Sequence, residues 1–132
     1  MKQSVDVVAL VICKDDKILV EKRKPNRTVD PGKVAIPGGH VEEHESLEYA
    51  CKRELDEELG IKCGKFVLIC KSLHCTDVED QTVHYYLCED WTGELESREA
   101  EKIFWVGPKE LGVLDFEIDR IAAEKVFRQL KK

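Results

Sequence analysis

The chain has 132 residues, and its 27 acidic and 21 basic side chains give a formal net charge of −6. This length predicts a single domain over residues 1–132, and a hydrophobic fraction of 42% is enough for a folded core. The acidic balance argues against binding to a nucleic acid polymer or an anionic membrane, because both need a basic face. It allows a phosphate-bearing substrate, because metal ions can reverse the local charge.

The sequence favours neither a membrane-spanning or signal segment nor a disulfide framework. No apolar run reaches the roughly 20 residues that span a bilayer, and the N-terminus lacks the pattern of a signal peptide. The six cysteines have no C-x-x-C spacing, which disfavours a zinc site. Their even count would permit disulfides, but most of them lie among apolar residues. We therefore expect a cytoplasmic protein with reduced, buried thiols.

The first third of the chain predicts strands joined by turns. β-branched residues dominate its apolar runs, and Pro and Gly separate them. Next to the last of these strands, Gly38 and Gly39 predict a tight turn in which the backbone approaches its neighbours closely. The expected elements are a buried strand at 4–13, a turn at 14–17, a hairpin strand at 18–22, a loop at 24–32 and a short strand at 33–36.

The remaining two thirds combine helices and strands. A helix is predicted over residues 46–59, with Ser46 as its N-cap and Gly60 as its stop signal. Strands are expected at about 65–75, 82–90 and 101–106, a helical turn after Pro108, and an amphipathic helix at about 118–130. The whole pattern predicts a mixed α/β domain.

The helix at 46–59 carries acidic residues where a structural helix would be apolar. At 100° per residue, Glu54 and Glu58 fall inside the apolar stripe and Glu57 falls at its edge. Carboxylates so placed repel each other and are poorly solvated, so a compensating positive charge is expected. Arg53 can pair with Glu57, and a hard divalent cation would compensate the others. A solvated acidic face is the alternative interpretation.

The segment from Gly39 to Ile61 resembles the Nudix box, whose pattern is G-x5-E-x7-R-E-U-x-E-E-x-G-U with U an aliphatic residue. All specified positions are met, by Gly39, Glu45, Arg53, Glu54, Leu55, Glu57, Glu58, Gly60 and Ile61. The segment holds eight acidic and two basic residues, so it accounts for the entire net charge. Two departures from the commonest family pattern are His44, where many members have glycine, and Val34, where many have tryptophan.

The resemblance implies a Nudix fold, an α/β/α sandwich around a mixed sheet. It also implies hydrolysis of a nucleoside diphosphate linked to another group, with Mg²⁺ or Mn²⁺ as cofactor. By the same resemblance Glu54, Glu57 and Glu58 would hold the metal, with Glu45 as an auxiliary ligand. The carbonyl of Gly38 would join them, and Arg53 would orient Glu57. The general base would be Glu54, Glu99 or Glu101, and we expect Glu101 rather than Glu99.

The expected substrate is a nucleoside triphosphate, oxidised or not, and we expect Arg23, Asp115 and Phe116 to contact it. An ADP-ribose or nucleotide-sugar pyrophosphatase is an alternative, although the proline that resembles the ADP-ribose signature is replaced by Thr76 and Asp77. A non-catalytic nucleotide-sensing domain is a second alternative. Isomerisation of a prenyl diphosphate is a third, disfavoured by the short chain. We expect a monomer or a homodimer.

Overall fold

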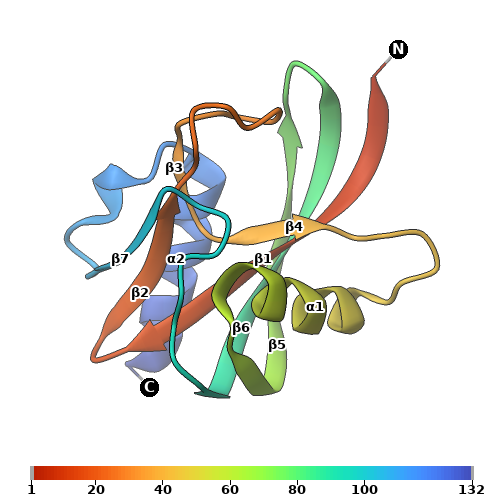
Figure 1. The fold of residues 1–132 in the computed structure, drawn as a ribbon. Coiled ribbons are helices and arrows are strands. Elements are labelled where there is room, and N and C mark those ends of the chain that lie inside the picture. Colours follow the sequence, from red (N-terminus) through yellow and green to blue (C-terminus); the bar gives the residue numbers. More distant parts are fainter. Residues whose placement is uncertain (1, 132) are drawn as a thin grey trace.

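The computed structural model describes residues 2–131, and its centre is a seven-stranded mixed sheet (Figure 1). The path through the sheet runs β3-β2-β1-β6-β5, with β4 paired to β1 and β7 paired to β2. β1 and β6 are parallel, and the other pairs are antiparallel. The strands are β1 (Gln3–Lys14), β2 (Lys17–Lys22), β3 (Val34–Ala35), β4 (Gly38–His40), β5 (Lys62–Cys75), β6 (Glu79–Thr92) and β7 (Lys102–Val106).

Two helices cover opposite faces of this sheet. Successive side chains of β1 alternate between the faces, so Val8 and Leu10 pack in the core beneath α1 (Leu47–Leu59), while Ala9 and Val11 pack in the core beneath α2 (Glu117–Leu130). All four side chains are at most 4% exposed. The expected α/β/α sandwich is confirmed, and the strand predicted at 4–13 is apolar because it is buried on both faces.

The chain reverses direction between β1 and β2 through Asp15 and Asp16. Both residues have positive φ angles, 52° and 61°, and Lys14 pairs directly with Lys17. This is the backbone geometry of a two-residue hairpin turn whose twist matches that of the strands, and aspartate tolerates it better than most residues do. The turn predicted at 14–17 is therefore confirmed.

Strands β5 and β6 are longer than expected, with 14 residues each. They form one long hairpin whose turn is closed by Thr76, since its Oγ1 donates to the carbonyl of Glu79 at 2.8 Å and accepts from the amide of Glu79 at 3.0 Å. Polar residues near the hairpin tip, such as Gln81, hid the start of β6 from a reading of hydrophobic pattern, and the missed part of β5 is its first three residues.

The tight turn predicted at Gly38 and Gly39 is wrong. Both residues belong to β4, in which Gly38 pairs with Ala9 and Gly39 with Val8. The close approach is present, because a Cβ atom on Gly38 would overlap with the carbonyl oxygen of Val8. Gly38 is therefore needed for close packing against β1 and not for a turn.

The remaining elements follow the expected order. The helical turn after Pro108 is a short 3-10 segment at Leu111–Val113, and α2 begins one residue before the predicted position. Between residues 2 and 131, none of the helices has the length and apolar character needed to cross a membrane.

Candidate active site

Helix α1 presents its acidic residues as the helical wheel predicted. Ser46 accepts a hydrogen bond from the amide of Tyr49 at 3.1 Å and starts the helix, and Gly60, with φ of 70°, ends it. Glu54 and Glu58 are 7% and 3% exposed, among apolar side chains of the same helix face. The side chain of Glu57 is 48% exposed. Two carboxylates are therefore held at the edge of the core, and a third lies beside them in solvent.

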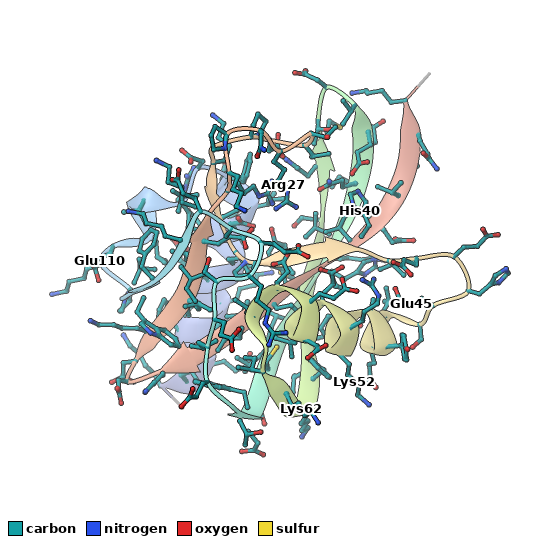
Figure 2. All side chains as sticks on the ribbon, viewed as in Figure 1. Arg27, His40, Glu45, Lys52, Lys62 and Glu110 are labelled. Carbon is teal, nitrogen blue, oxygen red and sulfur yellow. The ribbon has the colours of Figure 1, made fainter. Side chains whose placement is uncertain are left out.

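Arg53 connects the glutamates of the box. Its Nε and Nη2 donate to the two carboxylate oxygens of Glu45 at 2.6 and 2.8 Å, and its Nη1 donates to Glu54 at 2.7 Å and to Glu57 at 3.1 Å. The hydrogen bonds from Arg53 lower the pKa of Glu45 to about 2. The expected contact with Glu57 is present, but the shortest bond of Arg53 is to Glu45. Figure 2 shows Glu45 on the loop that enters α1.

Gly39 allows the carboxylate of Glu54 to lie against the backbone of β4. A Cβ atom on Gly39 would overlap with the carboxyl group of Glu54, so no other residue fits there without displacing it. Gly38 is also buried in β4, one residue earlier. The predicted ligands from the box and from the glycine pair thus lie on adjoining elements.

The buried carboxylates are poorly compensated. Burial raises the pKa of Glu54, and it raises the pKa of Glu58 well above its ordinary value, with nearby carboxylates adding to the effect on both. Oε2 of Glu58 is buried and has no hydrogen-bond partner among the described residues. Burying a carboxylate is costly unless it is paired or binds a metal. A cluster of carboxylate oxygens with one free buried oxygen fits a hard divalent cation.

Some of these carboxylate side chains would have to change conformation to hold a metal ion. Within residues 2–131, no group of three or more His, Cys, Asp or Glu side chains is already arranged to hold a metal ion. The reason is visible at Arg53, which occupies Oε1 of Glu54 and Oε2 of Glu57. The side chain of Glu57 is 48% exposed, so solvent can replace its bond to the arginine if it turns to a cation.

The two candidate bases before β7 lie in different surroundings. Glu99 is close enough to Glu54, Glu58 and the buried Glu21 for its charge to raise the pKa of each. Glu101 instead lies 3.7 Å from Nζ of Lys22, and its amide donates to the carbonyl of Lys22 at 2.9 Å. Glu99 therefore lies near the acidic cluster, and Glu101 contacts β2.

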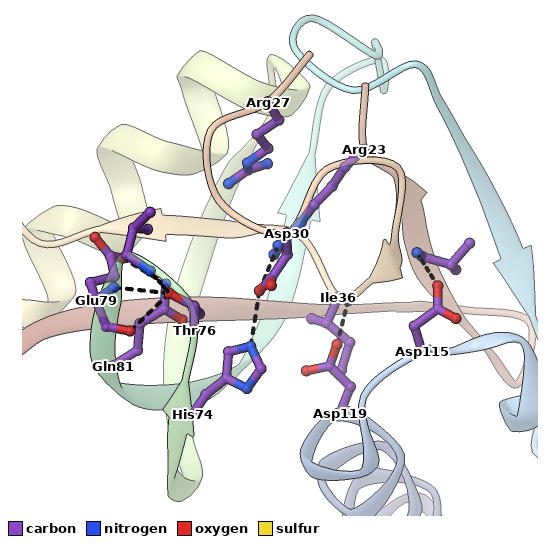
Figure 3. Close-up of polar contacts among 12 residues, drawn as sticks. Arg23, Arg27, Asp30, Ile36, His74, Thr76, Glu79, Gln81, Asp115 and Asp119 are labelled. Atoms are coloured by element: carbon purple, nitrogen blue, oxygen red, sulfur yellow. Dashed lines mark hydrogen bonds and ion pairs between the residues drawn. The ribbon is translucent and has the colours of Figure 1, made fainter. Parts of the chain in front are cut away.

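A pocket adjoins the cluster, bounded by β1, β4, β6, the loop after β2 and the start of α2. The guanidinium of Arg23 lies 5.8 Å from the ring centre of Phe116, and both residues line the pocket as expected. Asp115 does not line it, because its Oδ2 accepts from the amide of Val34 at 2.7 Å (Figure 3). Another acidic side chain, Asp119, lines the pocket instead.

Asp119 and His74 are pocket residues that the sequence analysis missed. Asp119 is 5% exposed and accepts hydrogen bonds from the hydroxyl of Tyr85 at 2.5 Å and the amide of Ile36 at 3.1 Å, while burial raises its pKa. His74 lies 2.9 Å from Oδ2 of Asp30 (Figure 3). Asp119 had the sequence signal of an ordinary residue at a helix start, and His74 that of a strand residue.

Comparisons with known proteins agree with this architecture. A NUDIX domain is matched over residues 2–130. Among relatives, the CTP pyrophosphohydrolase of Escherichia coli (strain K12) is 34% identical over 110 residues, covering 80% of this chain and 78% of the relative. The 8-oxo-dGTP diphosphatase of the same organism is 30% identical over 132 residues, covering 100% of this chain and 99% of the relative. The ADP-ribose pyrophosphatase of Bacillus subtilis (strain 168) is 33% identical over 112 residues, covering 83% of this chain and 58% of the relative.

The fold is likewise found among solved structures. The crystal structure of a MutT NUDIX hydrolase from Burkholderia pseudomallei matches with a TM-score of 0.84 at 31% identity, covering 95% of this chain and 99% of that chain. The fold and the box thus define a Nudix domain that retains its acidic helix. The chain belongs to the Nudix hydrolase family, and it is an enzyme of the MutT-like type.

Proposed function

We propose that this protein is a metal-dependent pyrophosphohydrolase acting on a nucleoside triphosphate. The observation that carries the proposal is the buried pair Glu54 and Glu58, of which Glu58 keeps a buried oxygen that no described residue bonds. Glu54, Glu57 and Glu58 would hold Mg²⁺ or Mn²⁺, with the Gly38 carbonyl as a further donor. Both oxygens of Glu45 accept hydrogen bonds from Arg53, so Glu45 would act as an auxiliary group that supports these ligands through the arginine.

The reaction is attack of water on phosphorus in line with the departing oxygen. The cation, when bound, supplies positive charge to the phosphate oxygens and makes water a better acid. Glu99, exposed beside the cluster, is our candidate to accept the proton of the attacking water, and Glu54 is the alternative. Arg53 has every donor engaged by the box, so it positions carboxylates and leaves the substrate to other groups.

The adjoining pocket would take the nucleoside. Arg23 and Phe116 offer a cation and an aromatic face, and Asp119 offers a carboxyl group to a base edge. A triphosphate is favoured because two relatives that align over most of their own length are named for CTP and 8-oxo-dGTP. The relative named for ADP-ribose aligns over a smaller share of its length. Cleavage would release a nucleoside monophosphate and pyrophosphate.

A substrate screen tests this proposal. The protein with Mg²⁺ would be incubated with normal and oxidised nucleoside triphosphates, ADP-ribose, nucleotide sugars and dinucleotides, and the products identified by mass. We expect pyrophosphate release from a triphosphate. Turnover of ADP-ribose alone would show instead that the protein is an ADP-ribose pyrophosphatase. Nucleotide binding without any product would select a sensing domain.

Variants of the acidic helix test the metal assignment. Glu58→Gln and Glu57→Gln should each lower turnover by more than about 100-fold, beyond the 10–100-fold that is typical of residues one shell further from a metal. Glu48→Gln, on the exposed first turn of the same helix, is the matched control and should stay within about twofold. Full activity of both test variants would refute the assignment.

A further inference from the structure

Glu21 is a buried carboxylate outside the Nudix box. It lies near the end of β2, paired on one side with Ala35 of β3 and on the other with Ile103 of β7. It is only 2% exposed. Leu19, two residues earlier, packs in the core beneath α1, so alternation along the strand directs Glu21 to the same face. Its side chain therefore points toward the acidic helix.

Glu21 meets Glu58 there. The two carboxyl groups lie close enough for the charge of Glu21 to raise the pKa of Glu58, and the charge of Glu99 raises the pKa of both. Each of the two also keeps one oxygen, Oε2, that is buried and has no hydrogen-bond partner within residues 2–131. Two neighbouring carboxylates at low solvent exposure repel each other unless a cation or a proton lies between them.

The neighbouring arginines only partly compensate Glu21. Its Oε2 lies 3.5 Å from Nη1 of Arg27 and 3.7 Å from Nε of Arg23, and neither contact is a hydrogen bond. Nε of Arg23 is itself buried, and no described residue forms a hydrogen bond with it. Figure 3 shows these arginines extending from the loop after β2 and from the end of that strand. The arginines balance part of the charge of Glu21 but donate no hydrogen bond to its Oε2, so this oxygen can accept a further ligand.

We propose that Glu21 is a further metal-ligating residue, which shares a divalent cation with Glu58. Its free oxygen and that of Glu58 supply hard donors from two different elements, β2 and α1. This inference rests on the metal-dependent function proposed above. It adds a ligand that lies 18 residues before the first position of the box, so the box pattern does not report it.

Direct measurement of cation binding tests the inference without any substrate. Mn²⁺ alone is titrated into the full chain, and free Mn²⁺ is followed by electron paramagnetic resonance. Glu21→Gln keeps the shape and hydrogen-bonding capacity of the side chain and removes its charge. We expect it to weaken Mn²⁺ binding by about tenfold or more, whereas the exposed Glu48→Gln should bind as the unaltered protein does. Melting without cation is measured alongside, because the substitution removes the repulsion from Glu58 and also the ion pairs with Arg23 and Arg27.

Unchanged Mn²⁺ affinity of Glu21→Gln would overturn the inference. If KM for a nucleotide rises in that variant while Mn²⁺ affinity stays the same, Glu21 serves only to hold the two arginines. Should Glu21→Gln fail to fold, Glu21→Asp keeps the charge and withdraws it by one methylene group, and undiminished Mn²⁺ binding by that variant would be equally contrary. An unaltered protein that binds no Mn²⁺ would instead refute the proposed function itself.

Discussion

The guanidinium of Arg53 holds both carboxylate oxygens of Glu45, at 2.6 and 2.8 Å, across the turn that leads into α1. Oε1 of Glu45 also accepts from the amide of Glu42 at 2.8 Å. Nη2 of Arg53 donates in addition to the carbonyl of His40 at 2.9 Å. One ion pair thus fastens the box loop at two points to the helix that carries Glu54, Glu57 and Glu58.

Glu45→Gln should therefore destabilise the protein in a pH-dependent way. Arg53 lowers the pKa of Glu45 from 4.5 to about 2 in the folded chain, so the charged form stabilises the fold above about pH 4.5. That stabilisation is lost as the pH falls from 4.5 toward 2. We expect a loss of about 1–2 kcal/mol at pH 7, because the pair is partly screened by solvent. Urea unfolding of both proteins at pH 7 and pH 3 measures it. An equal loss at the two pH values would contradict the ion-pair explanation.

His44→Gly should stabilise the fold. His44 has φ of 66°, in the left-handed region, and its side chain is 90% exposed. The left-handed conformation costs a non-glycine residue about 1–2 kcal/mol, and the greater freedom of glycine in the unfolded chain returns part of this. The expected gain is about 0.5–1 kcal/mol in urea unfolding. His44→Ala is the control and should give no gain, because it keeps the same backbone strain. An equal gain for alanine would implicate the imidazole instead.

The helical part of the site was predictable because it depends on one local period. Once residues 46–59 form a helix, the positions of Glu54 and Glu58 follow from 3.6 residues per turn. Contacts between distant strands have no such rule. The meeting of Glu21 with Glu58 depends on the pairing of β2 with β3 and β7, and Asp119 reaches Tyr85 only because α2 lies across β6. The prediction of a turn at Gly38 and Gly39 was wrong for the same reason, because pairing with β1 makes these two residues part of a strand.

Glu99→Gln should impair turnover far more than Glu101→Gln. Glu99 adds charge to the acidic cluster, and Glu101 is paired with Lys22. Loss of a general base typically costs about 10²–10⁴-fold in rate, so kcat of Glu99→Gln should fall by at least about 100-fold. Glu101→Gln should remain within about twofold of the unaltered protein. Steady-state kinetics at saturating Mg²⁺ measures both. The reverse order would restore Glu101 as the base, and two active variants would leave Glu54 in that role.

Stabilisation by Mg²⁺ should grow as the pH rises from 6 to 8. Burial raises the pKa of both Glu54 and Glu58, so without cation the folded chain binds more protons than the unfolded chain and loses stability as the pH increases. A cation competes with those protons for the same oxygens, and its apparent affinity therefore increases with pH. The rise in melting temperature on adding saturating Mg²⁺ should be several degrees larger at pH 8 than at pH 6. Glu58→Gln should show a smaller rise that depends less on pH, because only the contribution of Glu54 remains. A pH-independent rise in the unaltered protein would mean that Mg²⁺ binds away from these two carboxylates.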